Sequence, residues 1–277
     1  MQGKTVVITG ANSGIGRATA EALAKMGATV VMICRSRERG EAARNEIIAA
    51  TKNQNVELVV ADLSSMAEVA QAAAKVKSTH PKIHVLINNA AVFLPKREVT
   101  ADGLEKTFAT NYLSHFLLTH LLLDALKAAA PSRIVNVATK TTGMKINLDD
   151  LQLEKTKYSI FGAVGPSKLA QVLFTQELAR RLEGTGVTVN ALHPGVIRSG
   201  LLDDSPLWMR AMFGLMAKSP ERGAETPVYL ASSPQVEKVS GKLFADRKQI
   251  PVGGQALDAE KQTRLWDISM RLAKLSP

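Results

Sequence analysis

The chain alternates between short apolar runs and longer segments in which apolar residues recur with a helical period. The short runs are rich in β-branched residues and end at glycine or polar residues, which is typical of buried strands. The longer segments predict helices at residues 14–30, 38–51, 66–78, 102–128, 162–183, 206–217 and 221–231. The short runs predict strands at Thr5–Thr9, Thr29–Cys34, Val56–Ala61, Ile83–Asn88, Arg133–Val137, Val187–Leu192 and Lys242–Phe244.

This alternation of strands and helices indicates an α/β fold of the doubly wound type. Right-handed crossovers between consecutive strands give a mostly parallel sheet with helices on both faces. The sequence contains no repeat, low-complexity tract or linker, so we predict one domain over residues 1–277. A terminal amphipathic helix from about residue 258 is expected to pack on that domain.

The composition favours a cytoplasmic protein. Cys34 is the single cysteine, so an intramolecular disulfide is excluded, and no cysteine and histidine cluster predicts a metal site. The first residues lack the pattern of a signal peptide. Histidine and charged residues interrupt the most apolar stretch, residues 112–130, so no membrane span is expected.

The formal net charge is +10, which raises the question of an anionic partner. The basic residues are spread along the chain, and only 4% of residues are aromatic. No basic stripe with interleaved stacking side chains is present, so we expect no nucleic-acid partner. A cofactor rich in phosphate accounts for part of the excess more simply.

A glycine-rich turn directly follows the first predicted strand and opens a helix. Glycines in this context allow backbone N–H groups to approach a pyrophosphate at the positive end of the helix, as in a Rossmann fold. The alternative is an ordinary turn between a strand and a helix. The residues expected to bind the dinucleotide are Gly10, Asn12, Ser13, Gly14, Ile15 and Gly16.

The end of the second predicted strand indicates the choice of cofactor. An acidic residue there would bind a ribose diol, whereas a basic residue would bind a 2′-phosphate. The sequence has Arg35 and Ser36 and no carboxylate, so NADP(H) is preferred over NAD(H). The alternative is that Arg35 is a solvated loop residue.

The glycine-rich turn is followed along the chain by the motifs Asp62-Leu63, Asn88-Asn89-Ala90-Ala91, Asn111, Lys168 and Pro194-Gly195. With these motifs in this order, the chain resembles the classical short-chain dehydrogenases/reductases. The likeness extends over residues 3 to 245, and several short sequence segments are similar to those of the retinol-dehydrogenase-like branch. It implies adenine contacts from Asp62 and Leu63, ribose contacts from Asn89 and Ala90, and nicotinamide contacts from Pro194, Gly195, Val196 and Ser199, the last replacing the usual threonine.

The resemblance also implies a catalytic set of Asn, Ser, Tyr and Lys, which this chain matches in part. Asn111 and Lys168 match, and Thr139 stands at the serine position with its hydroxyl retained. Val164 stands at the tyrosine position, four residues before Lys168, and has no proton to give. Tyr158 is ten residues before Lys168, too far round a continuous helix to replace it.

Losing a positioned general acid costs about 10²–10⁴-fold in rate, so ordinary alcohol dehydrogenase activity should be weak. The apolar segment 206–216 is expected to cover a small apolar substrate, with core packing or weak contact with a membrane surface as alternatives. His115, His120 and His193 are interpreted as structural. A homodimer is possible, because relatives often pair through the helices that carry Asn111 and Lys168.

Three functions remain open. The first is an NADPH-dependent oxidoreductase that reduces an apolar carbonyl-like or iminium substrate. The second is a non-redox isomerase, lyase or cyclase that uses the cofactor as a scaffold. The third is a catalytically silenced NADP(H)-binding protein or an engineered variant. The first is preferred, because an intact cofactor site lies beside an empty acid position.

Overall fold

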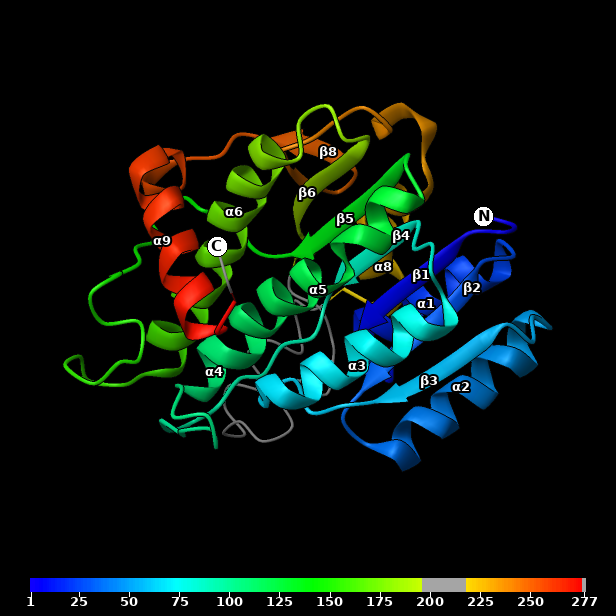
Figure 1. Ribbon diagram of the computed structural model, residues 1–277, viewed down its shortest axis with the longest axis horizontal. Helices are drawn as coiled ribbons and strands as arrows, with labels where there is room; N and C mark the ends of the chain where they lie inside the picture. Colours follow the sequence, from blue (N-terminus) through cyan, green and yellow to red (C-terminus); the bar gives the residue numbers. More distant parts are fainter. Residues whose placement is uncertain (196–217, 276–277) are drawn as a thin grey trace.

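The computed structural model describes residues 1–195 and 218–275, which form one eight-stranded sheet. The strand order is β3-β2-β1-β4-β5-β6-β7-β8, and every neighbouring pair is parallel except β7 and β8. The predicted doubly wound α/β fold is therefore confirmed (Figure 1). The strands are β1 (Thr5–Thr9), β2 (Thr29–Cys34), β3 (Val56–Val60), β4 (Val85–Asn88), β5 (Ser132–Val137), β6 (Val187–His193), β7 (Leu243–Ala245) and β8 (Lys248–Ile250).

Helices cover both faces of this sheet. One face packs against α1 (Gly14–Lys25), α2 (Arg37–Thr51) and α8 (Pro220–Ser232). The other packs against α3 (Met66–Thr79), α5 (Ser114–Ala128) and α6 (Ile160–Arg181), with α9 (Ala259–Leu272) beside α6 (Figure 1). Alternate strand residues belong to different cores, since Val7 and Val31 pack on the α3 side while Val6 and Ile8 pack on the α1 side. Both faces of the strands are apolar for this reason.

The helix predicted at 102–128 is confirmed from Lys106 to Ala128, but it begins four residues later than predicted and contains a π-helical turn. It divides into the short helix α4 (Lys106–Phe108), the π-helical turn η1 (Ala109–Leu113) and α5. The Glu105 carboxylate accepts hydrogen bonds from the backbone N–H groups of Thr107 and Phe108 and thereby starts the first turn. The π turn adds a residue to the helical repeat, which apolar periodicity does not reveal.

Strand β8 was not predicted from the sequence. Asp246 and Arg247 connect it to β7 with φ values of +47° and +62°. Positive φ at both central residues matches the twist of a tight hairpin, but glycine or asparagine normally signals it. The segment predicted as a helix at 206–217 lies outside the described residues.

Helix α9 packs its aromatic face on α5 and α6. The Trp266 ring lies 5.2 Å from the Phe116 ring and 6.1 Å from the Phe174 ring, centroid to centroid, and Arg181 stacks on its other side at 4.1 Å. A homodimer formed through α5 and α6 would therefore have to include or displace α9.

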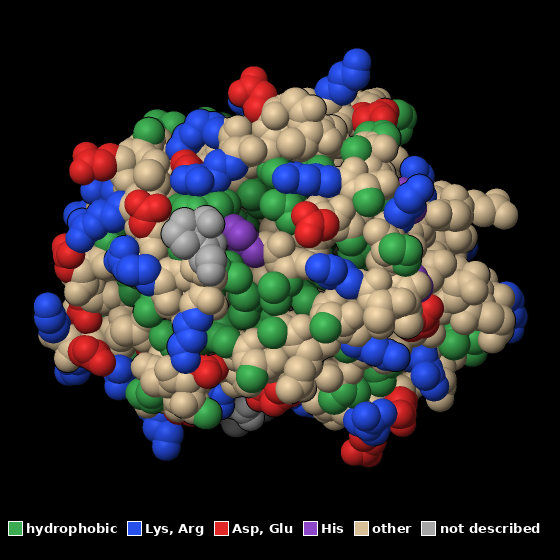
Figure 2. Space-filling view, viewed as in Figure 1, with side chains coloured by type: hydrophobic (Ala, Val, Ile, Leu, Met, Phe, Trp, Pro, Cys, Tyr) green, Lys and Arg blue, Asp and Glu red, His purple; other side chains and the backbone are tan. Residues whose placement is uncertain are grey.

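None of the helices in residues 1–195 and 218–275 is long and apolar enough to cross a bilayer. On the face seen in Figure 2, Lys and Arg side chains are scattered among Asp and Glu, with apolar side chains between them.

Candidate active site

A cleft of about 640 Å³ opens at the carboxyl ends of the parallel strands. It brings together residues that are far apart in the sequence, as expected for the switch point of a doubly wound sheet. Asn111 is buried behind its wall, and Val196 and Ser199 lie outside the described residues. The predicted site residues that line the cleft are Gly10, Asn12, Ser13, Gly14, Ile15, Gly16, Arg35, Ser36, Asp62, Leu63, Asn89, Ala90, Thr139, Val164, Lys168, Pro194 and Gly195.

The amino end of α1 is built to receive an anion. Ser13 has the extended backbone of a helix N-cap but makes no capping hydrogen bond, so the first N–H groups of α1 keep their capacity to bind a ligand. Elsewhere in the described chain, Ser36, Ser65 and Ser159 cap the helices that follow them. The uncapped end faces the cleft, where the pyrophosphate of a dinucleotide fits it.

The turn before α1 has room only for glycine. A Cβ on Gly16 would lie 2.2 Å from the Gly10 carbonyl oxygen, and Gly10 has φ +66°. The Asn89 side-chain amide donates to the Thr9 carbonyl at 2.8 Å and to the Gly10 carbonyl at 3.3 Å. Asn89 therefore ties the end of β4 to the turn in addition to lining the cleft.

The Thr9 hydroxyl links this turn to the next strand end. Its oxygen accepts from the N–H groups of Asn89 and Ala90 at 2.9 and 3.0 Å. It also lies 3.1 Å from Nε2 of His115, whose Nδ1 is 2.6 Å from Nε2 of Gln171. His115 is completely buried, and burial lowers its pKa to about 3. The position fits the structural role predicted for His115.

The adenosine end of the cleft carries two arginines. Arg35 follows β2 directly and is exposed, and Ser36 caps α2 by accepting from the N–H of Arg39 at 3.3 Å. Arg39 also lines the cleft, which the sequence analysis did not single out. Asp62 and Leu63 form the neighbouring wall, with the Asp62 carboxylate accepting from the N–H of Ser64 at 2.8 Å.

Lys168 lies at the opposite end, on the third turn of α6. Its Nζ donates to the Val137 carbonyl at 2.7 Å, and the side chain is buried. Burial lowers the pKa of Lys168 to about 8. A cation held at this depth can bind a ribose hydroxyl by donating a hydrogen bond.

Val164 lies one turn before Lys168 and presents an aliphatic side chain to the same cleft. Tyr158 points elsewhere: its hydroxyl donates to the Leu94 carbonyl at 2.9 Å and lies 3.4 Å from the Thr107 hydroxyl. Tyr158 is not among the residues that line the cleft. Tyr158 therefore does not supply a phenol beside Lys168, in agreement with its sequence spacing.

Asn111 lies in the π turn and holds the wall of the cleft. Its side-chain oxygen accepts from the N–H of Val92 at 2.7 Å, and its amide donates to the Val92 carbonyl at 3.1 Å. The same amide donates to the Ser167 hydroxyl at 3.3 Å, next to Lys168. Asn111 is thus placed to position the wall of the cleft and the start of α6.

The sequence analysis missed several cleft residues. His193 was assigned a structural role, yet it lines the cleft, with Nδ1 3.4 Å from the Thr139 hydroxyl oxygen. A group of apolar residues forms the wall near Val164, and this group consists of Val92, Phe93, Leu94, Met144 and Phe161. Phe161 lies in the first turn of α6 and the other four lie in loops, so no single periodic pattern links them and only their spatial proximity reveals the group.

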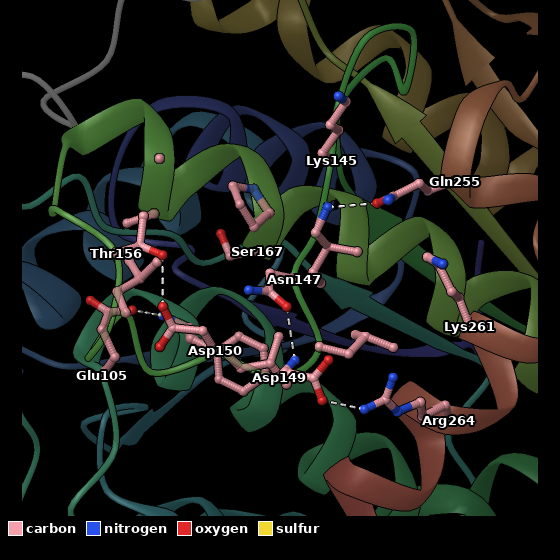
Figure 3. A pocket seen from close by; sticks show the side chains of 18 residues that line it. Glu105, Lys145, Asn147, Asp149, Asp150, Thr156, Ser167, Gln255, Lys261 and Arg264 are labelled. Carbon is pink, nitrogen blue, oxygen red and sulfur yellow. Dashed lines mark hydrogen bonds and ion pairs between the residues drawn. The ribbon is translucent and has the colours of Figure 1, made fainter.

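A second cavity of about 590 Å³ lies at the amino end of α6, lined by Ser167 and Pro166 (Figure 3). Some of its labelled side chains contact one another: Arg264 pairs with Asp149, and the Thr156 hydroxyl donates to Asp150 at 2.7 Å. The residues predicted to bind the cofactor line the larger cleft instead. Across residues 1–195 and 218–275, no group of three potential ligands could hold a metal ion.

Comparisons with known sequences agree with this geometry. The family model for short chain dehydrogenases matches residues 4–209. Retinol dehydrogenase 14 from Homo sapiens is 46% identical over 289 residues, covering 97% of this chain and 86% of the relative. Retinol dehydrogenase 13 from Homo sapiens is 44% identical over 282 residues, covering 99% and 85%.

Several solved structures have a fold similar to that of this chain. An uncharacterised protein from Mycobacterium paratuberculosis has a TM-score of 0.80 at 34% identity, with 99% of this chain and 95% of that chain covered. A gluconate 5-dehydrogenase from Beutenbergia cavernae with bound NADP has a TM-score of 0.72 at 28% identity, covering 89% and 96%. A 3-ketoacyl-(acyl-carrier-protein) reductase from Brucella melitensis complexed with NADH has a TM-score of 0.68 at 26% identity, covering 88% and 96%.

Proposed function

The chain belongs to the short chain dehydrogenase family, a family of oxidoreductases, and we propose that it is an NADPH-dependent reductase of an apolar carbonyl-like or iminium substrate. The observation that carries the proposal is one cleft that combines an uncapped helix end, two arginines and a buried lysine with an aliphatic side chain at Val164. Among the described residues, those predicted to bind the nucleotide line this cleft, and the side chain one turn before Lys168 is an aliphatic valine instead of a phenol.

The preference for NADPH rests on the adenosine end. Arg35 and Arg39 line the cleft beside the Ser36 cap and give two cationic donors for a 2′-phosphate. No carboxylate directly follows β2, so a ribose diol finds no acceptor at that position.

The substrate class rests on the wall near Val164. Phe93, Leu94, Met144 and Phe161 offer apolar surface next to Thr139 and Lys168. The relatives named retinol dehydrogenases suggest an elongated apolar alcohol or aldehyde as the first substrate to examine. Retinal is a suitable probe for this reason.

In the proposed reaction, different residues bind the cofactor and the substrate. The bound cofactor supplies the hydride. The α1 amides and Arg35 would hold its phosphates, Lys168 would donate to its ribose, and Thr139 would donate a hydrogen bond to the substrate oxygen. Because Val164 cannot supply a proton, an iminium substrate, which needs none, should react readily, while a neutral ketone depends on another proton donor and should react more slowly.

Cofactor choice is tested by calorimetry with NADP⁺ and NAD⁺. A hydrogen bond to a charged group contributes about 1.5–3 kcal/mol, so Arg35→Asp should weaken NADP⁺ binding by about tenfold or more. The matched control is Arg37→Asp, because Arg37 is two residues away, pairs with Glu41 and does not line the cleft. Binding of neither dinucleotide by the unmodified protein would overturn the proposal.

Reaction type is tested by following NADPH absorbance with retinal, simple ketones and preformed iminium ions. We expect oxidation of NADPH with an apolar member of the panel and slow turnover of simple ketones. Stable NADPH with every carbonyl, imine and enone would remove the redox proposal. Turnover with the oxidised cofactor and no absorbance change would favour an isomerase, lyase or cyclase.

A further inference from the structure

Thr139 and His193 meet because two parallel strands end side by side. Strands β5 and β6 pair with Val137 opposite Leu192, and the N–H of Ala138 donates to the Leu192 carbonyl at 2.8 Å. His193 is the last residue of β6, Thr139 is the second residue after β5, and both line the cleft. The distance of 3.4 Å between His193 Nδ1 and the Thr139 hydroxyl oxygen is long for a hydrogen bond. Catalytic hydrogen bonds commonly shorten when the substrate binds.

We propose that Thr139 and His193 form a proton relay that protonates the substrate oxygen in place of the phenol that Val164 cannot provide. The proposal rests on the reductase function proposed above and assigns His193, interpreted from the sequence as structural, a role in the reaction. Thr139 is the residue that contacts the substrate, and His193 supplies its proton.

For a neutral carbonyl, NADPH when bound would supply a hydride to the carbonyl carbon and would itself be oxidised to NADP⁺, while the π electrons of the C=O bond move to oxygen. The oxygen takes the proton of the Thr139 hydroxyl, and the Thr139 oxygen takes a proton from Nδ1 of protonated His193. Neutral His193 is protonated again at Nδ1 from water, so one hydride and one proton are consumed for each alcohol formed.

His193 differs in surroundings from the buried His115. His115 is completely enclosed, and both of its ring nitrogens contact side chains of the protein, Thr9 and Gln171. His193 is half-buried and faces the cleft. A ring with access to water can recover a proton after each turnover, whereas an enclosed ring cannot.

Charged groups from three elements determine when His193 is protonated. Burial is the main cause that lowers the pKa of His193, and Lys140 and Lys218 lower it further, while Asp246 raises it. Lys140 follows β5, Lys218 precedes α8 and Asp246 follows β7, where its carboxylate pairs with Lys218 at 2.8 Å. The protonated form needed by the relay therefore increases as the pH falls through a pKa below the usual 6.5.

The hydrogen-bonded pair is tested first without cofactor, by NMR titration of the histidine rings. Thr139→Val removes the hydroxyl with little change of volume, and should move the His193 titration and its ring-nitrogen shifts. Thr139→Ser keeps the hydroxyl and should leave both near their original values. Equal titration curves for Thr139→Val and the unmodified protein would overturn the pairing.

The relay itself is tested with NADPH and a neutral aldehyde. His193→Gln keeps a polar side chain but cannot carry the proton, so single-turnover reduction should slow by at least about tenfold, within the 10²–10⁴-fold range of general acids. The rise in rate at low pH should disappear, while calorimetric affinity for NADP⁺ stays the same. His80→Gln is the matched control, because His80 lies at the end of α3 against Glu57.

The outcomes separate the two proposals. If the unmodified protein oxidises NADPH with an aldehyde and His193→Gln gives the same rate and pH profile, the relay is wrong and the reductase function stands. If His193→Gln slows the reaction only through weaker NADP⁺ binding, the relay is also wrong. If the unmodified protein binds NADP⁺ but none of the tested substrates causes oxidation of NADPH, both proposals fail.

Discussion

Lys168 and Val164 occupy neighbouring turns of α6 and contribute opposite chemistry to one cleft. Lys168 is a buried cation that donates to the Val137 carbonyl, whereas Val164 is aliphatic and has no donor. On this helix, Lys168 is placed to hold a cofactor, whereas position 164 decides whether the helix can supply a proton. The helix can therefore keep its cofactor-binding lysine without having a proton donor at position 164.

A phenol at position 164 should restore the supply of a proton from α6 to the substrate. Val164→Tyr places a hydroxyl in the cleft one turn from Lys168, and a positioned general acid contributes about 10²–10⁴-fold. We expect at least about a tenfold increase in NADPH oxidation with a neutral aldehyde, measured in single-turnover experiments. The gain should be largest where Lys168 is protonated, below its pKa of about 8.

Val164→Phe is the matched control for this change. It adds the ring without the hydroxyl, so it separates proton donation from altered packing in the cleft. A gain of the same size in both variants would mean that packing, and not proton supply, limits the reaction.

At the scale of elements, the turn between β1 and α1 is determined by close approach of the backbone. Gly10 and Gly16 face each other across the turn, and Asn89 reaches over from the end of β4. Hydrogen bonds from Asn89 to the Thr9 and Gly10 carbonyls hold the turn against the end of β4. The helix dipole and its free N–H groups are consequently aimed at one place.

Gly16→Ala should damage this element. The new Cβ would lie 2.2 Å from the Gly10 carbonyl oxygen, so the turn must shift. Overpacking of this kind costs typically about 1–3 kcal/mol, which urea unfolding can measure. Calorimetry should show NADP⁺ affinity reduced by more than about tenfold, since 1.4 kcal/mol corresponds to that factor.

Gly253→Ala provides the comparison, because a Cβ there meets no atom within 4 Å. Its unfolding curve and NADP⁺ affinity should match those of the unmodified protein. Equal behaviour of the two variants would contradict the close-packed cradle.

At the scale of the whole molecule, a buried polar chain connects the turn with the middle of the protein. Thr9, His115 and Gln171 follow one another, and Gln171 donates to the Asn111 carbonyl at 2.8 Å. This series of hydrogen-bonded side chains runs from β1 through α5 to α6 and joins the cofactor end of the cleft to the catalytic end. Among its side chains, only that of His115 is titratable.

His115 should make the protein sensitive to acid. Its pKa falls from 6.5 to about 3 on burial, so between these values the unfolded chain binds a proton that the folded chain does not. The free energy of unfolding therefore decreases as the pH falls from 6.5 towards 3, by ~1.4 kcal/mol per pH unit from this residue. Urea unfolding between pH 7 and pH 4.5 measures the slope.

His115→Gln should flatten this slope by about one proton, even if it lowers stability at pH 7. An unchanged slope in His115→Gln would show that His115 takes up a proton in the folded protein.

The sequence by itself determined the doubly wound sheet, the glycine-rich turn and the positions of Arg35, Val164 and Lys168 along the chain. These features are local, since periodicity, β-branched runs and glycine spacing act within a few residues. The π turn at Asn111 and the β7–β8 hairpin were missed, because helix continuity and turn conformation respond to packing that no short pattern records.

Only the tertiary structure decided which side chains share the cleft. His193 and Arg39 give no special signal in the sequence, and the apolar wall comes from loops and the first turn of α6. The physical reason is that strand pairing sets the distance between side chains more than fifty residues apart, as for Thr139 and His193. Tertiary packing also placed the Tyr158 hydroxyl on the Leu94 carbonyl, outside the lining of the cleft.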